Sequence, residues 1–225
     1  MGPVTVPPAS DLGCGNFAVP GIRVHPEPML RIHGYSEPGQ AAPGIRAAAA
    51  RMAARAEQLF QMDLSYRMLK INRCDEHALT LETGTILQCG KSGSNLMDCT
   101  MAVAFFLTAG EELDKEAARL HAAGGILEVL FLESAGWLGI EAATKSFANY
   151  LRDWAPPHGY ALGARLAPGY GSWPLTDQKP LLSLFDPFSL SVRLLESCAM
   201  VPKMSRSGLY GLRLRPPTKA ESRSG

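Results

Sequence analysis

The sequence has almost no excess charge and no long apolar run. Among its 225 residues, Lys and Arg number 22 and Asp and Glu number 21, so the formal net charge is +1. This balance excludes proteins that bind nucleic acid by bulk positive charge, and equally excludes acidic, solvating proteins. The longest apolar stretch, residues 99–110, is far shorter than the roughly 20 residues that span a bilayer. We therefore expect neither nucleic-acid binding nor a membrane segment.

Paired cysteines and paired metal ligands are also missing. The odd number of cysteines and the lack of any C-x-x-C pair predict free thiols in a reducing cytoplasm. The N-terminus has no basic segment followed by an apolar one, so no secretory signal is expected. The five histidines are far apart in sequence, which argues against a zinc site. The cysteines are Cys14, Cys74, Cys89, Cys99 and Cys198.

Hydrophobic residues make up 46% of the chain, enough to build a sizeable core, and Gly and Pro are numerous at 22 and 17. Prolines are dense in residues 1–43, which predicts an extended or irregular segment with a short strand at 21–24. We expect three regions: this Pro-rich segment, one folded domain over 44–215, and a disordered polar tail over 216–225.

The periodicity of the apolar residues predicts helices and short strands in separate groups. Helices are expected at 45–60, from a capping box at Thr108–Glu111 to His121, at 126–154 and at 181–188. Strands are expected within 64–90, at 101–107 with both faces buried, at 192–201 and at 208–215, and a loop at 159–174. Because regular βαβ alternation is absent, the fold class is α+β.

The segment 165–174, RLAPGYGSWP, combines an arginine with two glycines, two prolines and two aromatic residues. The Arg165 guanidinium suits a carboxylate or a phosphate, while Tyr170 and Trp173 offer faces to a flat base or a cation. A ligand with an anionic end, a flat base and a positive centre matches this set. The alternative is a loop whose aromatic residues simply cover the core.

This segment resembles a known family. Arg165-x-x-Pro-Gly-Tyr170, followed by Trp173-Pro174, is similar to the R-x-x-x-G-Y loop with which the activation domain of cobalamin-dependent methionine synthase binds S-adenosylmethionine. The sequence FLTAG at 106–110 resembles the buried strand and turn of short, stand-alone members. Glu196-Ser-x-Ala-Met200, with Pro202, Ser205, Ser207 and Gly208, resembles the family's C-terminal motif. The resemblance covers about residues 77–215.

The resemblance implies a C-shaped single domain of the α+β class, with a twisted antiparallel sheet and flanking helices. It implies a stand-alone activation module that binds S-adenosylmethionine. The module would support reductive remethylation of cob(II)alamin on a partner, either a methionine synthase, which is a methyltransferase of methionine biosynthesis, or another corrinoid methyltransferase. The partners implied are a cobalamin-binding methyltransferase subunit and a flavodoxin- or ferredoxin-like electron donor. Cobalamin would arrive on the partner, because the sequence has no D-x-H-x-x-G motif.

The resemblance also implies the site residues. Arg165 would bind the carboxylate of S-adenosylmethionine, and backbone groups at Ala167 and Gly169 would meet its amino-acid or adenine part. Tyr170 would lie at the face shared by ligand and corrinoid, with Trp173 beside it. Glu141, set among small residues on the long helix, would favour the ammonium or sulfonium. No residue is assigned a catalytic role, since such a domain supplies positioning.

The sequence departs from the family's pattern. Lys145 stands one turn after Glu141, where the large synthases have a second acidic residue, and no counterpart of their N-terminal aspartate can be located. The tyrosine that follows the last motif is replaced by a run toward Arg213 and Arg215. A docking protein of the same fold that has lost its ligand is therefore an alternative. An independent methyltransferase is disfavoured, since no strand–G-x-G-x-x-G–helix unit occurs.

Overall fold

A computed structural model describes residues 13–186 and 189–215. Its core element is an antiparallel sheet, whose strands are β1 (Cys14–Asn16), β2 (Asp63–Cys74), β3 (Leu79–Leu81), β4 (Ile86–Leu87), β5 (Met101–Thr108), β6 (Tyr160–Leu166) and β9 (Ser205–Leu214). The strand order is β4-β3-β2-β5-β9-β6, with β1 also paired to β2, and every pair is antiparallel. A separate hairpin joins β7 (Arg193–Leu194) to β8 (Met200–Val201).

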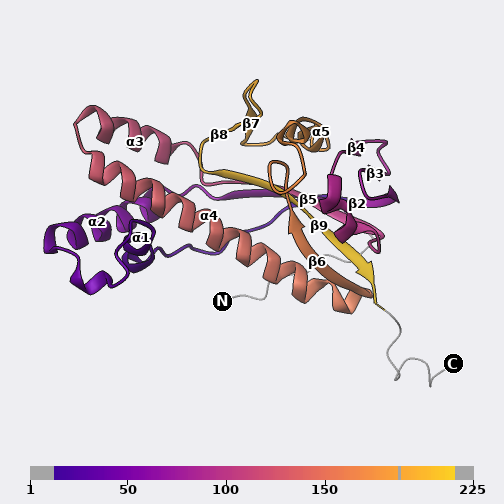
Figure 1. Ribbon diagram of the computed structural model, residues 1–225, viewed down its shortest axis with the longest axis horizontal. Coiled ribbons are helices and arrows are strands. Elements are labelled where there is room, and N and C mark those ends of the chain that lie inside the picture. The colour runs from indigo at the N-terminus through magenta and orange to yellow at the C-terminus, as the bar shows by residue number, and fades with distance from the viewer. Residues whose placement is uncertain (1–12, 187–188, 216–225) are drawn as a thin grey trace, which may run out of the picture.

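Five helices flank the sheet in the described residues: α1 (Pro26–Ile32), α2 (Pro43–Leu59), α3 (Glu112–Ala122), α4 (Ile126–Trp154) and α5 (Gln178–Ser183). Residues of α1 to α4 belong to the core on one face of the sheet, and α4 runs along much of the molecule (Figure 1). The opposite face is covered by α5 and by the segment around residues 89–99. This arrangement confirms the predicted fold class, an antiparallel sheet with flanking helices.

Burial on both faces explains the apolar run of β5. Side chains alternate along a strand, and Val103, Phe105 and Leu107 enter the core under α1 to α4. The residues between them, Ala104 and Phe106, enter the core under α5. Neither face of this central strand therefore reaches solvent, as the sequence predicts.

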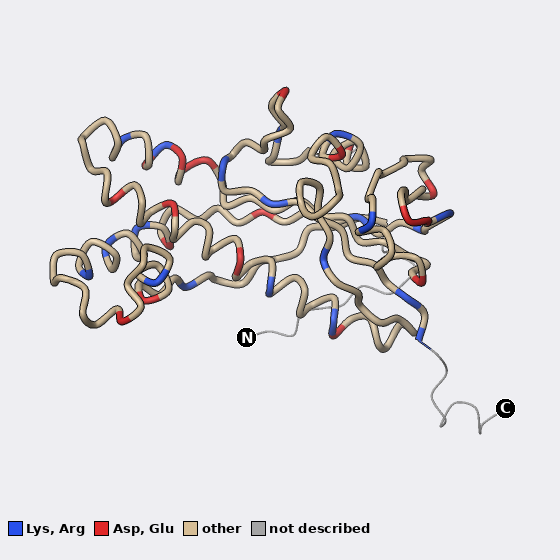
Figure 2. The backbone as a smooth tube through the Cα atoms, in the orientation of Figure 1, with Lys and Arg blue, Asp and Glu red and all other residues tan. Residues whose placement is uncertain are grey.

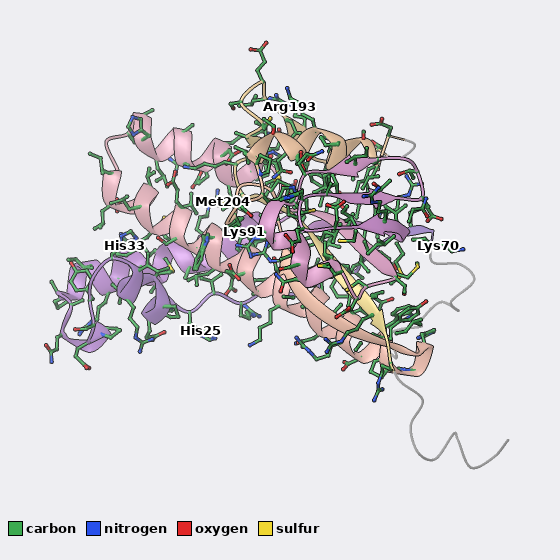
Figure 3. The ribbon with its side chains drawn as sticks, turned by 45° about the vertical axis from the view of Figure 1, so that its right-hand side comes forward. His25, His33, Lys70, Lys91, Arg193 and Met204 are labelled. Carbon is green, nitrogen blue, oxygen red and sulfur yellow. The ribbon has the colours of Figure 1, made fainter. Side chains whose placement is uncertain are left out.

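The small residues of α4 accept side chains of neighbouring elements. A methyl group added at Gly139 would lie 2.4 Å from Cζ of Phe60, and one added at Gly136 would lie 2.9 Å from Cγ of Met204, which is labelled in Figure 3. These glycines allow an aromatic ring and a thioether to pack closely against the helix.

Two sequence-based boundaries near helix starts differ from the structure. Residues 21–24 form no strand, and Pro26 begins helix α1. Proline is compatible with the first turn of a helix, so it marks a helix start here. Thr108 is the last residue of β5, and α3 begins four residues later without a side-chain cap. The predicted capping box is therefore wrong, and the Thr108 hydroxyl instead accepts a hydrogen bond from the Gly110 N–H at 3.1 Å.

The C-terminal half contains the largest differences. Residues 160–166, predicted as part of a loop, form edge strand β6 against β9. Residues 192–201 form the β7–β8 hairpin where one strand was expected, and β9 begins at Ser205, before the predicted start at 208. Residues 187–188 and the predicted tail at 216–225 lie outside the described residues.

The surface charges are mixed along the chain. Figure 2 shows residues of both signs along the helices. Within the described part of the chain, no helix combines the length and apolar character that crossing a bilayer requires.

Candidate functional site between helix α4 and the loop after strand β6

A β-bulge determines which way Arg165 faces. Leu162 pairs with Leu212 and Arg165 pairs with Tyr210, so β6 advances three residues while β9 advances two. An extra residue in one strand shifts the alternation of its side chains. Because residues directly opposite each other share a face, Arg165 lies on the face of Tyr210. Tyr210 packs against Phe105 on the side covered by α4.

The guanidinium of Arg165 is incompletely paired. Its Nη1 is buried and has no hydrogen-bond partner among the described residues. Its Cζ lies 5.9 Å from the centroid of the Tyr170 ring, within the range of a cation–π contact. A buried donor without an acceptor is costly in free energy. Among the described residues, the other buried side-chain nitrogen without a partner is Trp154 Nε1.

A second arginine lies on the same face and contacts Glu141. Arg206 donates from Nη2 to Glu141 Oε1 at 2.7 Å and from Nη1 to Thr144 Oγ1 at 3.2 Å. The hydrogen bond from Arg206 lowers the pKa of Glu141 despite partial burial, and the positive charges of Arg206 and Arg165 lower it further. Two guanidinium groups thus accompany one carboxylate, leaving a local excess of one positive charge.

Sequence reasoning missed Arg206. It falls at a variable position between Ser205 and Ser207 of the C-terminal motif, and it precedes the residues predicted as a strand. In the structure it is inside β9, opposite Leu107 of β5. A charged residue inside a strand that is central to the sheet was the available signal, because such a charge requires a partner when it is buried. Because the strand was predicted to begin only at residue 208, Arg206 was not recognised as a charged residue inside a strand.

A pocket of about 170 Å³ lies beside these charges. Helix α4, the loop after β6, the first residue of α5 and the segment that enters β9 form its walls. Tyr170 is 64% exposed and Trp137 is 48% exposed, so two aromatic side chains are available at the opening. The lining residues are Trp137, Ile140, Ala167, Pro168, Tyr170, Gln178, Met200, Lys203, Met204, Ser205, Arg206 and Ser207.

The loop after β6 is held by its own backbone. Gly169 has φ +88°, a conformation that side-chain-bearing residues rarely adopt. Its N–H donates to the Trp173 carbonyl at 2.8 Å, and the Tyr170 N–H donates to the Ala167 carbonyl at 3.3 Å. The Gly169 donor predicted to meet a ligand is thus already used inside the loop, whereas Ala167 lines the pocket.

Trp173 lies in the core and does not line the pocket. Its side chain is 2% exposed, and its Nε1 donates to Asp177 Oδ2 at 2.7 Å. The same carboxylate oxygen accepts the backbone N–H of Gln88. Trp173 was expected to contact a ligand, but its side chain lies in the core that α5 covers. It therefore anchors the loop to that core.

The structure thus gathers most of the predicted site residues. Ala167 and Tyr170 line the pocket, whereas Arg165 and Glu141 do not. Arg165 contacts the ring of Tyr170, and Glu141 is paired with Arg206, which lines the pocket. Lys145, one turn beyond Glu141, is exposed. Within the described ranges, no group of three or more His, Cys, Asp or Glu residues is arranged to hold a metal ion.

Comparisons with known proteins bear on the fold. No protein-family model and no curated protein matches the chain. The crystal structure of the MetH reactivation domain bound to AdoHcy matches 92% of this chain and 80% of that chain, with a TM-score of 0.58 and 19% sequence identity. An identity this low speaks to the fold alone. The chain therefore has the fold of the MetH reactivation domain.

Proposed function

We propose that this protein is an activation-type module that binds S-adenosylmethionine, or its demethylated form S-adenosylhomocysteine, beside Arg165. The observation that carries the proposal is the buried, unpaired Nη1 of Arg165, whose guanidinium carbon lies 5.9 Å from the ring centroid of Tyr170, a residue that lines the pocket. The carboxylate of the ligand supplies the missing acceptor, and charge-assisted hydrogen bonds of this kind are among the stronger ones in proteins. The AdoHcy bound to the domain of the same fold supports this choice of ligand.

The remaining groups of the site suit the other parts of such a ligand. Tyr170 and Trp137 offer exposed aromatic faces that attract a sulfonium or stack on a base. Glu141 uses Oε1 for Arg206, while its Oε2 forms no hydrogen bond with a described residue and is available to an ammonium. Because Arg206 offsets much of the Glu141 charge, we assign the larger share of the binding free energy to Arg165.

The proposed role of the bound ligand is reductive remethylation. A flavodoxin- or ferredoxin-like donor would reduce the partner's cob(II)alamin to cob(I)alamin by one electron. S-adenosylmethionine would then supply its electrophilic methyl group to the cobalt, and S-adenosylhomocysteine would be the leaving group. The residues of this chain hold the ligand and orient it, so their contribution is positioning. The corrinoid belongs to the partner, since this sequence lacks a D-x-H-x-x-G motif.

Calorimetric titration tests ligand binding. S-adenosylmethionine and S-adenosylhomocysteine are titrated into the wild type, Arg165→Ala and Arg73→Ala, the last a control because the Arg73 side chain is 77% exposed. Loss of the charge-assisted contact should cost about 1.5–3 kcal/mol, which is roughly a tenfold to hundredfold weaker affinity. Equal binding by Arg165→Ala would overturn the assignment. No heat with any variant would favour a docking protein that has lost its ligand.

A second experiment tests the proposed role. The protein is added to a cob(II)alamin-loaded methyltransferase with S-adenosylmethionine and a reduced flavodoxin or ferredoxin, and the visible spectrum is followed. We expect methylcobalamin to form with the wild type and the Arg73→Ala control, and more slowly with Arg165→Ala. Ligand binding without methylcobalamin formation would leave the module a binding protein and remove the remethylation role.

A further inference from the structure

Gln178 is a buried polar residue at the pocket that neither motif includes. It is the first residue of α5, its exposed fraction is 3%, and it lines the pocket. Its Oε1 accepts a hydrogen bond from the Ser207 hydroxyl at 2.8 Å. Buried amides are usually hydrogen-bonded at both ends. Whether the amide nitrogen, Nε2, has a hydrogen-bond partner in the protein therefore decides whether Gln178 can bind a ligand.

The amide nitrogen of Gln178 has no partner within the described part of the chain. The buried side-chain atoms there that lack both solvent and a partner are Trp154 Nε1 and Arg165 Nη1, so Gln178 Nε2 is not sealed into the packing. Gln178 is one of the residues that line the pocket. Two N–H donors on Nε2 are therefore available to a group inside the pocket.

The residue is held firmly enough to discriminate between ligands. The preceding residue, Asp177, is buried and accepts hydrogen bonds from Trp173 Nε1 and the Gln88 N–H. On the other side, Ser207 belongs to the central strand β9 and binds the amide oxygen. A polar group fixed from both sides loses little side-chain entropy when it binds a ligand.

Other polar side chains of the pocket are already engaged. Arg206 binds Glu141, Lys203 Nζ donates to Glu133 Oε1 at 2.5 Å, and the Ser205 hydroxyl lies 2.9 Å from that of Thr108. Much of the remaining wall is apolar or aromatic, formed by Trp137, Ile140, Met200 and Met204. A flat heterocycle with one hydrogen-bonding edge fits this combination better than a highly polar group.

We propose that Gln178 binds the edge of the adenine ring and selects adenine over hypoxanthine, an inference that rests on the proposed nucleoside ligand. Nε2 donates to a ring nitrogen, and Oε1, which has a second lone pair beside the Ser207 bond, accepts the exocyclic N6–H. Hypoxanthine carries an acceptor oxygen at position 6, which opposes Oε1. Ser207 keeps the amide oxygen on the sheet side and so sets the preference.

The test compares bases and variants by calorimetry. S-adenosylhomocysteine, S-inosylhomocysteine and free adenosine are titrated into the wild type, Gln178→Glu, Ser207→Ala and Arg165→Ala. Gln178→Glu keeps the shape and the acceptor for Ser207 but removes the donor, and Gln40→Glu, at an exposed position, controls for the added charge. We expect the wild type to prefer the adenine ligand by about tenfold or more. Gln178→Glu should lose this preference, and Ser207→Ala should narrow it.

The different ligands and variants distinguish a failure of this inference from a failure of the proposed function. If Gln178→Glu binds S-adenosylhomocysteine like the wild type, or if the wild type binds both bases equally, the base assignment is overturned while the Arg165 site stands. Adenosine has no carboxylate, so Gln178→Glu should weaken it and Arg165→Ala should not. Wild-type binding to none of the three overturns both proposals. If Gln178→Glu does not fold by circular dichroism, the wild-type comparison of the two bases decides.

Discussion

Arg206 of β9 and Glu141 of α4 form an ion pair between a buried guanidinium and a half-buried carboxylate. Nη2 and Oε1 are 2.7 Å apart, and the two side chains are 10% and 43% exposed. The pair joins the sheet to α4 beside the pocket. Because Arg206 is the more buried partner, its charge depends on Glu141 more than Glu141 depends on it.

Glu141→Gln should therefore destabilise the fold by leaving the Arg206 charge uncompensated. We expect a loss of about 1–2 kcal/mol in the free energy of unfolding, reduced from the value for a fully buried pair because Glu141 is partly solvated. Urea denaturation at pH 7 measures it. Glu133→Gln on the same helix is the control, because its pair with Lys203 is 37% and 62% exposed and should contribute less than about 1 kcal/mol. Equal losses in both variants would contradict the argument.

Glu116 of α3 should make stability depend on acid pH. Hydrogen bonds from Arg119, and then from Arg55, lower its pKa from 4.5 to about 2 although burial opposes the shift. The unfolded chain then binds more protons than the native one, so this stabilisation is complete above about pH 4.5 and is lost as the pH falls toward 2. The difference in urea midpoint between wild type and Glu116→Gln should shrink from pH 7 to pH 3. A constant difference would show that Glu116 is not held ionised.

Arg165→Met should raise the stability of the ligand-free protein while weakening ligand binding. The substitution eliminates a buried donor without a partner and keeps an unbranched side chain of similar length. We expect a gain of about 1 kcal/mol in the free energy of unfolding. Thermal denaturation with and without S-adenosylhomocysteine should show a higher melting temperature of the free protein and a smaller ligand-induced rise than in the wild type. A lower melting temperature with a preserved ligand effect would indicate a structural role for Arg165.

Gly169→Ala should strain the loop that carries Tyr170. The residue has φ +88°, and an added methyl group would lie 3.1 Å from Cδ1 of Leu175. A left-handed backbone costs about 1–2 kcal/mol for an ordinary residue. Gly21→Ala is the control, since it has no atom within 4 Å and no positive φ. Urea denaturation should separate the two variants, and a neutral Gly169→Ala would mean that the loop can change its conformation freely.

Gly139→Ala should disturb the contact between α4 and the end of α2. The new methyl group would lie 2.4 Å from Cζ of Phe60, which cannot be relieved without moving the ring. Overpacking of this kind costs about 1–3 kcal/mol. Gly44→Ala, also in a helix but with nothing within 4 Å, should be neutral or stabilise by up to about 1 kcal/mol. Similar unfolding free energies for the two variants would contradict the close packing.

Much of the fold was readable from the sequence because it depends on local periodicity. Helix α4 has the predicted bounds of 126–154, and β5 extends the predicted strand at 101–107 by one residue. Elements that gain their stability from distant partners were not readable. Strand β6 carries Gly163, whose backbone lies close to Gly211 of β9, and only that pairing makes residues 160–166 a strand.

The same distinction, between what the local sequence determines and what distant contacts determine, applies to the candidate site. One short segment of the sequence, from Arg165 to Tyr170, contains the residue types that bind an anionic, aromatic ligand. The same segment carries the family resemblance that identified the expected ligand. Which residues meet was decided by tertiary structure. The bulge turns Arg165 toward α4, Arg206 reaches Glu141 across 65 positions of sequence, and Trp173 points into the core. These outcomes follow from strand register and burial, which depend on the whole packed sheet and not on any one segment.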